Sequence, residues 1–292
     1  MKLTVNNVNV QLYMEDCIAG IPARLEPGRV DVLVTSPPYN IGTEYGSYDD
    51  KISREDYLEW IERWARVCSD ALSDSGSIFL NIGSKPSDPW VPFDVAQTMR
   101  RHFTLQNVFH WVKSIYIESD SYGQQTAISV GHYKPINSKR YVNDTHEYIF
   151  HFTKQGDVEL DRLAVGVPYK DKSNIERWEG AKQDLRCRGN TWYIPYKTIQ
   201  SSHSQRPHPA SFPPQLAEMC IRLHGTKKAG LVLDPFMGIG NTALACVQLG
   251  IEFTGFEIDQ EYFQEACRQL SGQSTLFDGL ADWSENGGNT KE

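Results

Sequence analysis

Residues 231–249 read LVLDPFMGIGNTALACVQL, and this stretch decides the fold class. The apolar run at 231–234 has the composition of a buried strand, and 241–249 has that of a helix closed by Gly250. Glycines at 238 and 240 lie between them and let the backbone approach a ligand at the start of the helix. A strand, a glycine loop and a helix in this order are typical of α/β proteins that bind nucleotides.

The glycine loop differs from two common phosphate-binding motifs. It lacks the lysine of a Walker loop and the GxGxxG spacing of a dinucleotide fingerprint. A small anion such as an amino-acid carboxylate therefore fits it better than a pyrophosphate. The next apolar run, EFTGFE, ends in Glu257, whose carboxylate can accept both hydroxyls of a ribose. Together these features predict a ligand that joins a nucleoside to an amino acid.

The rest of the chain alternates between segments with the pattern of strands and segments with the pattern of helices. Expected strands lie at 30–35, 77–82, 106–112 and 147–153, with an edge strand in the first thirteen residues. One expected helix follows the capping box at Ser53, and another ends near Arg101. Two more are expected at 213–224 and 260–270. This alternation predicts a Rossmann-like, doubly wound, mostly parallel α/β sheet.

Two segments are too irregular for this pattern. Residues 114–143 are polar and longer than an ordinary connection, which indicates a functional or mobile loop. Residues 155–205 show no sustained period, and 160–210 holds nine Lys or Arg against five Asp or Glu. We therefore expect a basic recognition insert within a chain whose net charge is −8.

Composition narrows the functional class. The 292 residues contain no apolar run long enough to span a bilayer, and the N-terminus lacks the features of a signal peptide. We expect a cytoplasmic protein without a membrane segment. The six cysteines are scattered, with no CxxC pair and no histidine spaced for zinc, so the sequence predicts buried thiols and no metal site.

Three motifs resemble those of one enzyme family. TSPPYN at 35–40 is similar to the catalytic motif of DNA amino-methyltransferases, and DPFMGIGNT at 234–242 is similar to their S-adenosylmethionine loop. HPASFP at 208–213 resembles the segment that precedes that loop. The order of the motifs is that of the circularly permuted β class, which implies the class I methyltransferase fold. The likeness extends from about Leu12 to Phe263.

The resemblance also implies a division of the chain. Residues 1–154 correspond to the catalytic part of the methyltransferase domain and 155–205 to its target-recognition insert. Residues 206–275 correspond to the cofactor-binding part. The acidic segment 276–292 is expected to be a flexible tail.

The catalytic residues implied by the resemblance are Ser36, Pro37, Pro38 and Tyr39. An exocyclic amine is a poor nucleophile because its lone pair is delocalised into the ring. Acceptance of its hydrogens by the Ser36 hydroxyl and the Pro37 carbonyl would direct that lone pair at the methyl group. Tyr39 would stack on the base after it leaves the duplex.

The resemblance implies a cofactor site formed by residues from both ends of the chain. Its expected residues are Asp16, Phe212, Asp234, Phe236, Gly238, Gly240, Thr242 and Glu257. Asp16 would contact the adenine amine, although an acid before a helix is often only a cap. Asp234 is expected to orient the loop. The loop departs from the family pattern at Ile239 and Asn241, where small hydroxyl residues are usual, so its ligand contacts are expected to rest on backbone amides.

DNA contacts are expected from basic residues in the two irregular segments. The candidates are Lys134, Lys139, Arg140, Arg186, Arg188 and Arg206. Those in the insert are interleaved with Trp178, Trp192 and Tyr193, and basic and aromatic residues together grip phosphates and read base edges. A solvated surface over a small aromatic core is the alternative interpretation.

Within the resemblance, serine at the first motif position favours cytosine N4 as the target. Adenine N6 is the alternative, and RNA or protein amides are a more remote one. A catalytically silent nucleic-acid-binding module is disfavoured because both loops are intact. The expected partners are double-stranded DNA and a cognate restriction endonuclease, with the protein a monomer or a homodimer.

Overall fold

The computed structural model describes residues 1–43, 50–119, 126–131, 137–177, 183–195 and 211–285, with side chains described up to Gly272 except at 174 and 176. Its centre is a nine-stranded sheet in the order β1-β2-β11-β10-β3-β4-β8-β5-β9. The strands are β1 (Lys2–Val5), β2 (Val8–Tyr13), β11 (Glu252–Phe256), β10 (Leu231–Asp234), β3 (Val30–Thr35), β4 (Leu72–Ile82), β8 (His146–Thr153), β5 (Thr104–Val112) and β9 (Thr191–Tyr193). All neighbours from β2 to β4 are parallel, whereas β8 runs antiparallel to both β4 and β5.

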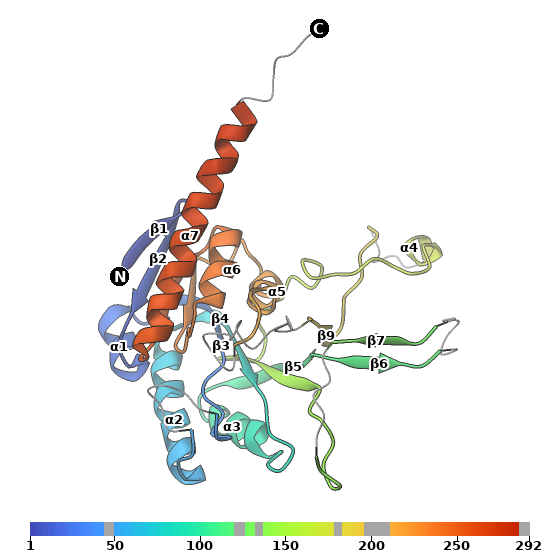
Figure 1. Cartoon of the computed structure of the whole chain (residues 1–292), viewed down its shortest axis with the longest axis horizontal. Coiled ribbons are helices and arrows are strands. Elements are labelled where there is room, and N and C mark those ends of the chain that lie inside the picture. The colour runs from blue at the N-terminus through green and yellow to red at the C-terminus, as the bar shows by residue number, and fades with distance from the viewer. Residues whose placement is uncertain (44–49, 120–125, 132–136, 178–182, 196–210, 286–292) are drawn as a thin grey trace.

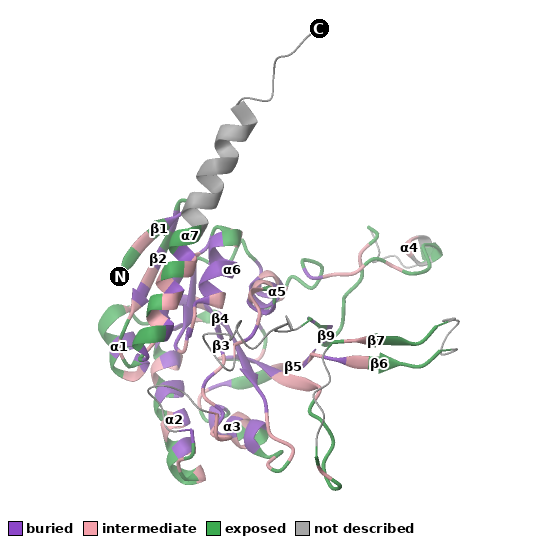
Figure 2. Ribbon diagram, viewed as in Figure 1, coloured by how far each residue is buried: buried purple, intermediate pink, exposed green. Residues whose placement is uncertain are grey.

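Helices cover both faces of the sheet (Figure 1). They are α1 (Cys17–Arg24), α2 (Arg54–Ala71), α3 (Val91–Met99), α5 (Pro214–His224), α6 (Asn241–Leu249) and α7 (Gln260–Glu285). Helices α1 to α3 bury their apolar sides in one core cluster, and α5 to α7 bury theirs in another. Figure 2 shows the buried residues gathered in the sheet and on the helix surfaces that face it. The fold is therefore the doubly wound α/β arrangement that the sequence predicts.

The connections reverse direction between β10 and β3. From β3 the chain passes through α2 to β4, and from β10 it passes through α6 to β11 on the opposite side. Loops that leave two adjacent parallel strands in opposite directions open a crevice at the carboxyl ends of those strands, where open α/β sheets bind ligands. The TSPPYN and DPFMGIGNT segments both leave the sheet at this point.

The N-terminal segment forms two strands where the sequence predicts one. Asn6 and Asn7 have positive φ angles of 50° and 63° and join β1 to β2 in a two-residue turn, with Val5 opposite Val8. Asparagine tolerates this conformation, and the turn matches the twist of a hairpin. The hairpin leaves β1 at the edge and pairs β2 with β11.

The two irregular segments contain structure that periodicity did not reveal. Within 114–143, the strands β6 (Ile115–Ile117) and β7 (Ile128–Val130) pair antiparallel and extend away from the main sheet (Figure 1). Within 155–205, β9 joins the main sheet beside β5, and the short helix α4 (Ser173–Arg177) lies at the end of a projecting segment.

Helix α7 differs from its predicted extent. The sequence predicts an end near Leu270, but the helix continues to Glu285, through the expected start of the tail at residue 276. No helix within the described residues combines the length and apolarity needed to cross a membrane.

Candidate active site

The loop after β3 is held by the segments around it. The carboxylate of Asp50, which is 2% exposed, accepts hydrogen bonds from the amides of Asn40 and Ile41 at 2.7 and 3.1 Å and from those of Gly42 and Thr43 at 3.1 and 2.8 Å. Asn40 itself has a positive φ of 56°, which asparagine tolerates better than most residues. One buried carboxylate therefore fixes the exit of the SPPY segment.

Helix α2 supports the same loop from the side. The Tyr57 hydroxyl donates to the carbonyl of Pro38 at 2.8 Å, and Tyr57 is fully buried. Prolines at 37 and 38 restrict the backbone further because their rings fix φ. Ser36 is consequently presented by a backbone segment with little freedom.

Asp234 connects the two loops. Its carboxylate accepts hydrogen bonds from the hydroxyls of Thr35 at 2.7 Å and Thr242 at 2.6 Å and from the amide of Phe236 at 3.1 Å. Burial raises the pKa of Asp234 to about 6, and the two threonine hydrogen bonds partly oppose that rise. The carboxylate thus ties the end of β3 to the end of β10 and the start of α6.

The glycine loop has the backbone geometry that glycine permits. Gly238 and Gly240 have φ angles of 52° and 85°, and a Cβ on Gly240 would lie 3.1 Å from the Cβ of Ala266. The Gly238 amide donates to Glu257 at 2.9 Å, and the Gly240 amide donates to the carbonyl of Met237 at 2.9 Å. Both amides have partners within the protein. The positive φ angles of the two glycines allow close approach of the backbone.

Glu257 follows β11 at the same edge of the sheet. Its two carboxylate oxygens accept from the amides of Gly238 and Asp259 at 2.9 and 2.8 Å, and burial raises its pKa. A carboxylate has about four lone-pair positions, more than the backbone amides around Glu257 occupy, so it can also accept from a ligand. Asp16 lies beyond the adjacent β2, where it is the N-cap of α1 and accepts from the Ile18 amide at 2.6 Å.

The two aromatic candidates, Phe212 and Phe236, line the same cavity. Phe236 contacts Trp60 and Trp64, with ring centroids 5.2 and 5.5 Å apart. Phe212 is 7% exposed, and its carbonyl accepts from the Asn241 side chain at 2.7 Å. Asn241, where the sequence departs from the family loop, therefore links the segment before α5 to the glycine loop.

Two cavities meet at Ser36. The first, called the cofactor-side cavity after the role that the resemblance predicts for it, is lined by Ser36, Ser211, Phe212, Asp234, Phe236, Met237, Gly238 and Asn241. The second, called the base-side cavity for the same reason, is lined by Ser36, Tyr39, Asn81, Trp111, Glu147, Ser211 and Phe212. Three residues, Ser36, Ser211 and Phe212, line both cavities. Ser36 therefore stands where a group in one cavity would face a group in the other.

Side chains from four strands or strand ends form a polar network in the base-side cavity. The Ser36 and Tyr39 hydroxyl oxygens are 2.8 Å apart, and the Tyr39 hydroxyl donates to Glu147 at 3.0 Å. The Asn81 amide donates to both Tyr39 and Glu147, and Lys113 forms an ion pair with Glu147 at 2.8 Å. Tyr39 is 9% exposed and is held at its hydroxyl end.

Sequence reasoning missed Asn81, Glu147, Lys113 and Asp50. Glu147 and Asn81 are 66 positions apart, so no motif spacing connects them. A signal was nevertheless present, because an amide inside the run SIFLNI and an acid at the head of EYIFHFT are polar residues in otherwise apolar strands.

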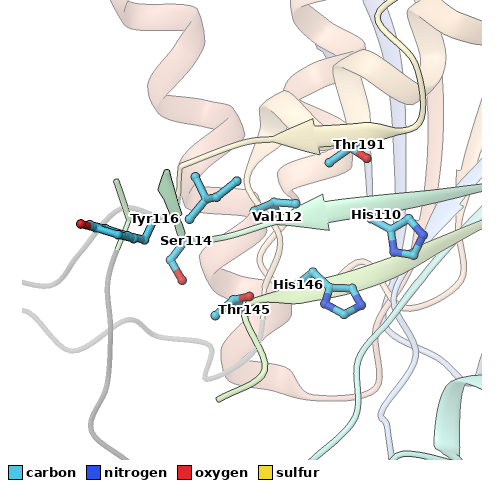
Figure 3. Close-up of a pocket in the computed structure, with 8 residues that line it drawn as sticks. His110, Val112, Ser114, Tyr116, Thr145, His146 and Thr191 are labelled. Carbon is cyan, nitrogen blue, oxygen red and sulfur yellow. The ribbon is translucent and has the colours of Figure 1, made fainter. Parts of the chain in front are cut away.

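A further cavity of about 380 Å³ lies beside the β6–β7 hairpin (Figure 3). It is lined by His110, Val112, Ser114, Ile115, Tyr116, Thr145, His146 and Thr191. The His110 and His146 rings are 5.3 Å apart, and burial and then the neighbouring His110 lower the pKa of His146. Side chains alternate along a strand, so these histidines occupy the face opposite to Trp111 and Glu147.

None of the described residues expected to contact DNA lines these three cavities. Lys139, Arg140, Arg186 and Arg188 are exposed, whereas Lys134, Trp178 and Arg206 lie outside the described residues. The Arg188 side chain donates to the carbonyl of Val165 at 2.8 Å, and the Arg140 guanidinium lies 5.3 Å from the Tyr141 ring centre.

Trp192 does not belong to that exposed set. It is 1% exposed, packs against Phe109 with ring centroids 4.6 Å apart, and donates to the carbonyl of Gly189. The alternative interpretation of an aromatic core is the correct one for this residue, because β9 is a strand of the main sheet.

The fold and the site together define a class of protein. A doubly wound sheet with a glycine loop after one strand, an acid after the next and a crevice between them is the class I methyltransferase fold. In agreement, the PvuII DNA methyltransferase, described as cytosine-N4-specific, has a TM-score of 0.64 at 18% identity, over 91% of this chain and 92% of that one. The M1.HpyAVI–SAM complex has a TM-score of 0.53 at 24% identity, over 89% and 99%.

The chain belongs to the DNA methylase family of N6 and N4 methyltransferases, whose model matches residues 30–268. The type II methyltransferase M.HpaI of Haemophilus parainfluenzae is 27% identical over 259 residues, which are 88% of this chain and 73% of that protein. The DNA adenine methyltransferase YhdJ of Escherichia coli strain K12 is 26% identical over 245 residues, which are 82% and 76%. The relatives thus include enzymes of more than one type.

Proposed function

We propose that this DNA methyltransferase transfers a methyl group from S-adenosylmethionine to the exocyclic N4 amine of a cytosine flipped out of duplex DNA. The observation that carries the proposal is the meeting of two cavities at Ser36. One cavity is bordered by the glycine loop, and the other is lined by hydrogen-bonding side chains and Trp111. A methyl donor and an amine placed in them would face each other across Ser36.

The cofactor-side residues fit S-adenosylmethionine. Glu257 has lone pairs available for ribose hydroxyls, and Phe212 and Phe236 provide apolar walls. Asp16 follows the strand beside β11, on the side where the adenine would lie. When bound, the cofactor supplies an electrophilic methyl group on a sulfonium. The chain's own residues hold the two reactants in line, which replaces a bimolecular encounter with a positioned one.

Ser36 and the Pro37 carbonyl act on the amine. Both are acceptors, and hydrogen bonds from the amine to them oppose delocalisation of its lone pair into the ring. The nitrogen then presents that lone pair toward the methyl group. The N–C bond would form as the bond from sulfur to the methyl carbon breaks, S-adenosylhomocysteine would leave, and the methylated amine would lose one proton to solvent. Tyr39 and Trp111 border the base-side cavity and offer aromatic surface to the flipped base, which offsets part of the cost of unstacking.

Serine at the first motif position supports cytosine as the target, and so does the fold likeness to a cytosine-N4-specific enzyme. Adenine N6 is the second candidate, favoured by the likeness to an adenine methyltransferase. The type II names of other relatives support a role beside a cognate restriction endonuclease. Segment 155–205 and the loop that carries Lys139 and Arg140 are the proposed DNA-recognition parts.

The test is to incubate the protein with methyl-labelled S-adenosylmethionine and mixed-sequence duplex DNA, digest the DNA, and identify the labelled nucleoside by mass spectrometry. Label in N4-methylcytosine supports the proposal, and label in N6-methyladenine would show that the target base is adenine instead of cytosine. Ser36→Ala is the matched variant, with transfer expected to fall on the order of 100-fold while cofactor binding persists. Absence of labelled DNA despite cofactor binding overturns the proposal.

A further inference from the structure

The hydrogen-bond network around Glu147 has a fixed direction. Lys113 donates to Oε1 at 2.8 Å, and the Tyr39 hydroxyl and the Asn81 amide donate to Oε2 at 3.0 and 2.7 Å. An ionised carboxylate accepts hydrogen bonds and donates none. The single hydroxyl proton of Tyr39 is therefore committed to Glu147.

This commitment determines what Ser36 can do. The Ser36 and Tyr39 oxygens are 2.8 Å apart, and either hydroxyl is able to donate by distance alone. With the Tyr39 proton directed at Glu147, Ser36 has to donate its own proton to Tyr39. A serine hydroxyl has one proton and two lone pairs, so Ser36 meets a substrate with lone pairs only.

Asn81 adds a second acceptor to the same cavity wall. Its amide nitrogen donates to Tyr39 at 2.8 Å and to Glu147 at 2.7 Å, which fixes the orientation of the amide. The Asn81 Oδ1 atom is buried and has no hydrogen-bond partner among the described residues, and the residue is 1% exposed. A buried acceptor without a partner is unfavourable, so this wall also demands a donor.

We infer that Glu147 is a positioning residue that makes the base-side cavity selective for a base with an amino group at the reacting position over a base with a carbonyl there. The inference rests on the proposed function. A keto base such as uracil would place its O4 lone pairs against the lone pairs of Ser36, whereas the cytosine amine supplies two donors. Glu147 is not in contact with Ser36 in the network and acts on it through Tyr39.

Glu147→Gln tests this assignment because it keeps the shape and replaces one acceptor oxygen by an NH₂ donor, while the remaining oxygen accepts from Lys113. Its NH₂ can donate to Tyr39, which frees Tyr39 to donate to Ser36 and Ser36 to donate to the base. Positions methylated by the wild-type enzyme are first mapped by sequencing. Binding is then measured, with S-adenosylhomocysteine present, to short duplexes with cytosine or uracil at the target. For an adenine target the pair is adenine and hypoxanthine.

We expect the preference of the wild-type protein for the amino base to fall roughly tenfold or more in Glu147→Gln. Tyr39→Phe removes the connecting hydroxyl and should reduce the preference as well. The double variant should lose no more than the larger single effect, because both act through one chain of hydrogen bonds. Glu218→Gln, which replaces an acid paired with Arg222 on α5, is the matched control and should retain the wild-type preference.

Retention of the wild-type preference by Glu147→Gln, with the melting temperature and cofactor affinity unchanged, overturns the inference. If that variant does not fold, an unchanged preference in Tyr39→Phe overturns it equally. Failure of the proposed function is distinct, because the wild-type protein would then leave DNA unlabelled in the first experiment.

Discussion

At the scale of single residues, buried carboxylates organise the site. Asp234 joins the two motif loops, Asp50 holds the exit of the SPPY loop, and Glu147 sets the direction of the base-side network. Each is surrounded by donors from segments distant in the sequence. A buried carboxylate is costly unless such donors satisfy it, so these residues couple the local loop geometry to the tertiary fold.

Asp234 gives the protein a defined pH dependence. Its pKa in the folded state is about 6, raised by burial from 3.8. The folded state therefore binds this proton more tightly than the unfolded state, and the resulting stability is present below about pH 4 and lost as pH rises through 6. Asp234→Asn removes the titration. Its unfolding free energy relative to wild type should rise between pH 4 and 7 by on the order of 3 kcal/mol.

Urea unfolding at several pH values measures this difference. Asp74→Asn is the control, because that side chain is 97% exposed. A difference between Asp234→Asn and wild type that stays constant from pH 4 to 7 would contradict the assignment.

At the scale of elements, the SPPY loop depends on one acceptor from outside the motif. Asp50→Asn keeps the size of the side chain but places an NH₂ group among four amide donors. We expect a loss of stability of about 2 kcal/mol and a lower rate of methyl transfer, because donors in the loop lose their partner. Hydrogen exchange at residues 40–43 should accelerate. Exchange there at the wild-type rate would show that the loop is held by other contacts.

Strand β9 provides a second test at this scale. Trp192 is fully enclosed by the core, whereas its neighbour Tyr193 is 37% exposed on the other side of the strand. Trp192→Ala should lower the unfolding free energy by about 3–5 kcal/mol, because it leaves a large cavity. Tyr193→Ala is the paired control with a much smaller effect. If Trp192→Ala weakened DNA binding while stability stayed at the wild-type value, a recognition role would replace the structural one.

At the scale of the whole molecule, charge is distributed unevenly. The net charge is −8, yet exposed basic residues occur on the segments beside the β6–β7 hairpin and in the segment that carries α4, which extend from the same side of the sheet (Figure 1). A protein that neutralises DNA phosphates with local basic groups can bind despite a negative total, because screening limits the reach of distant charges.

The salt dependence of binding tests this distribution. Four single alanine variants are compared, at Lys139, Arg140, Arg186 and Arg188. If the replaced residue contacts a phosphate, the plot of log DNA-binding constant against log salt concentration should become less steep by about 1. Arg268→Ala on α7 is the control, with a side chain that is 76% exposed on another part of the molecule. Unchanged slopes for all four variants would remove these segments from the DNA interface.

The sequence alone determined the α/β fold class, the positions of the two loops and the family. Local patterns carry this information, because β10, α6 and the proline-rich loop are each encoded by consecutive residues. Periodicity could not reveal β9, which is three residues long, or distinguish the buried Trp192 from a base-reading aromatic. Only the tertiary structure decided which polar side chains join Ser36. Asn81 and Glu147 lie in β4 and β8 and Lys113 directly follows β5, and only strand pairing brings their side chains together.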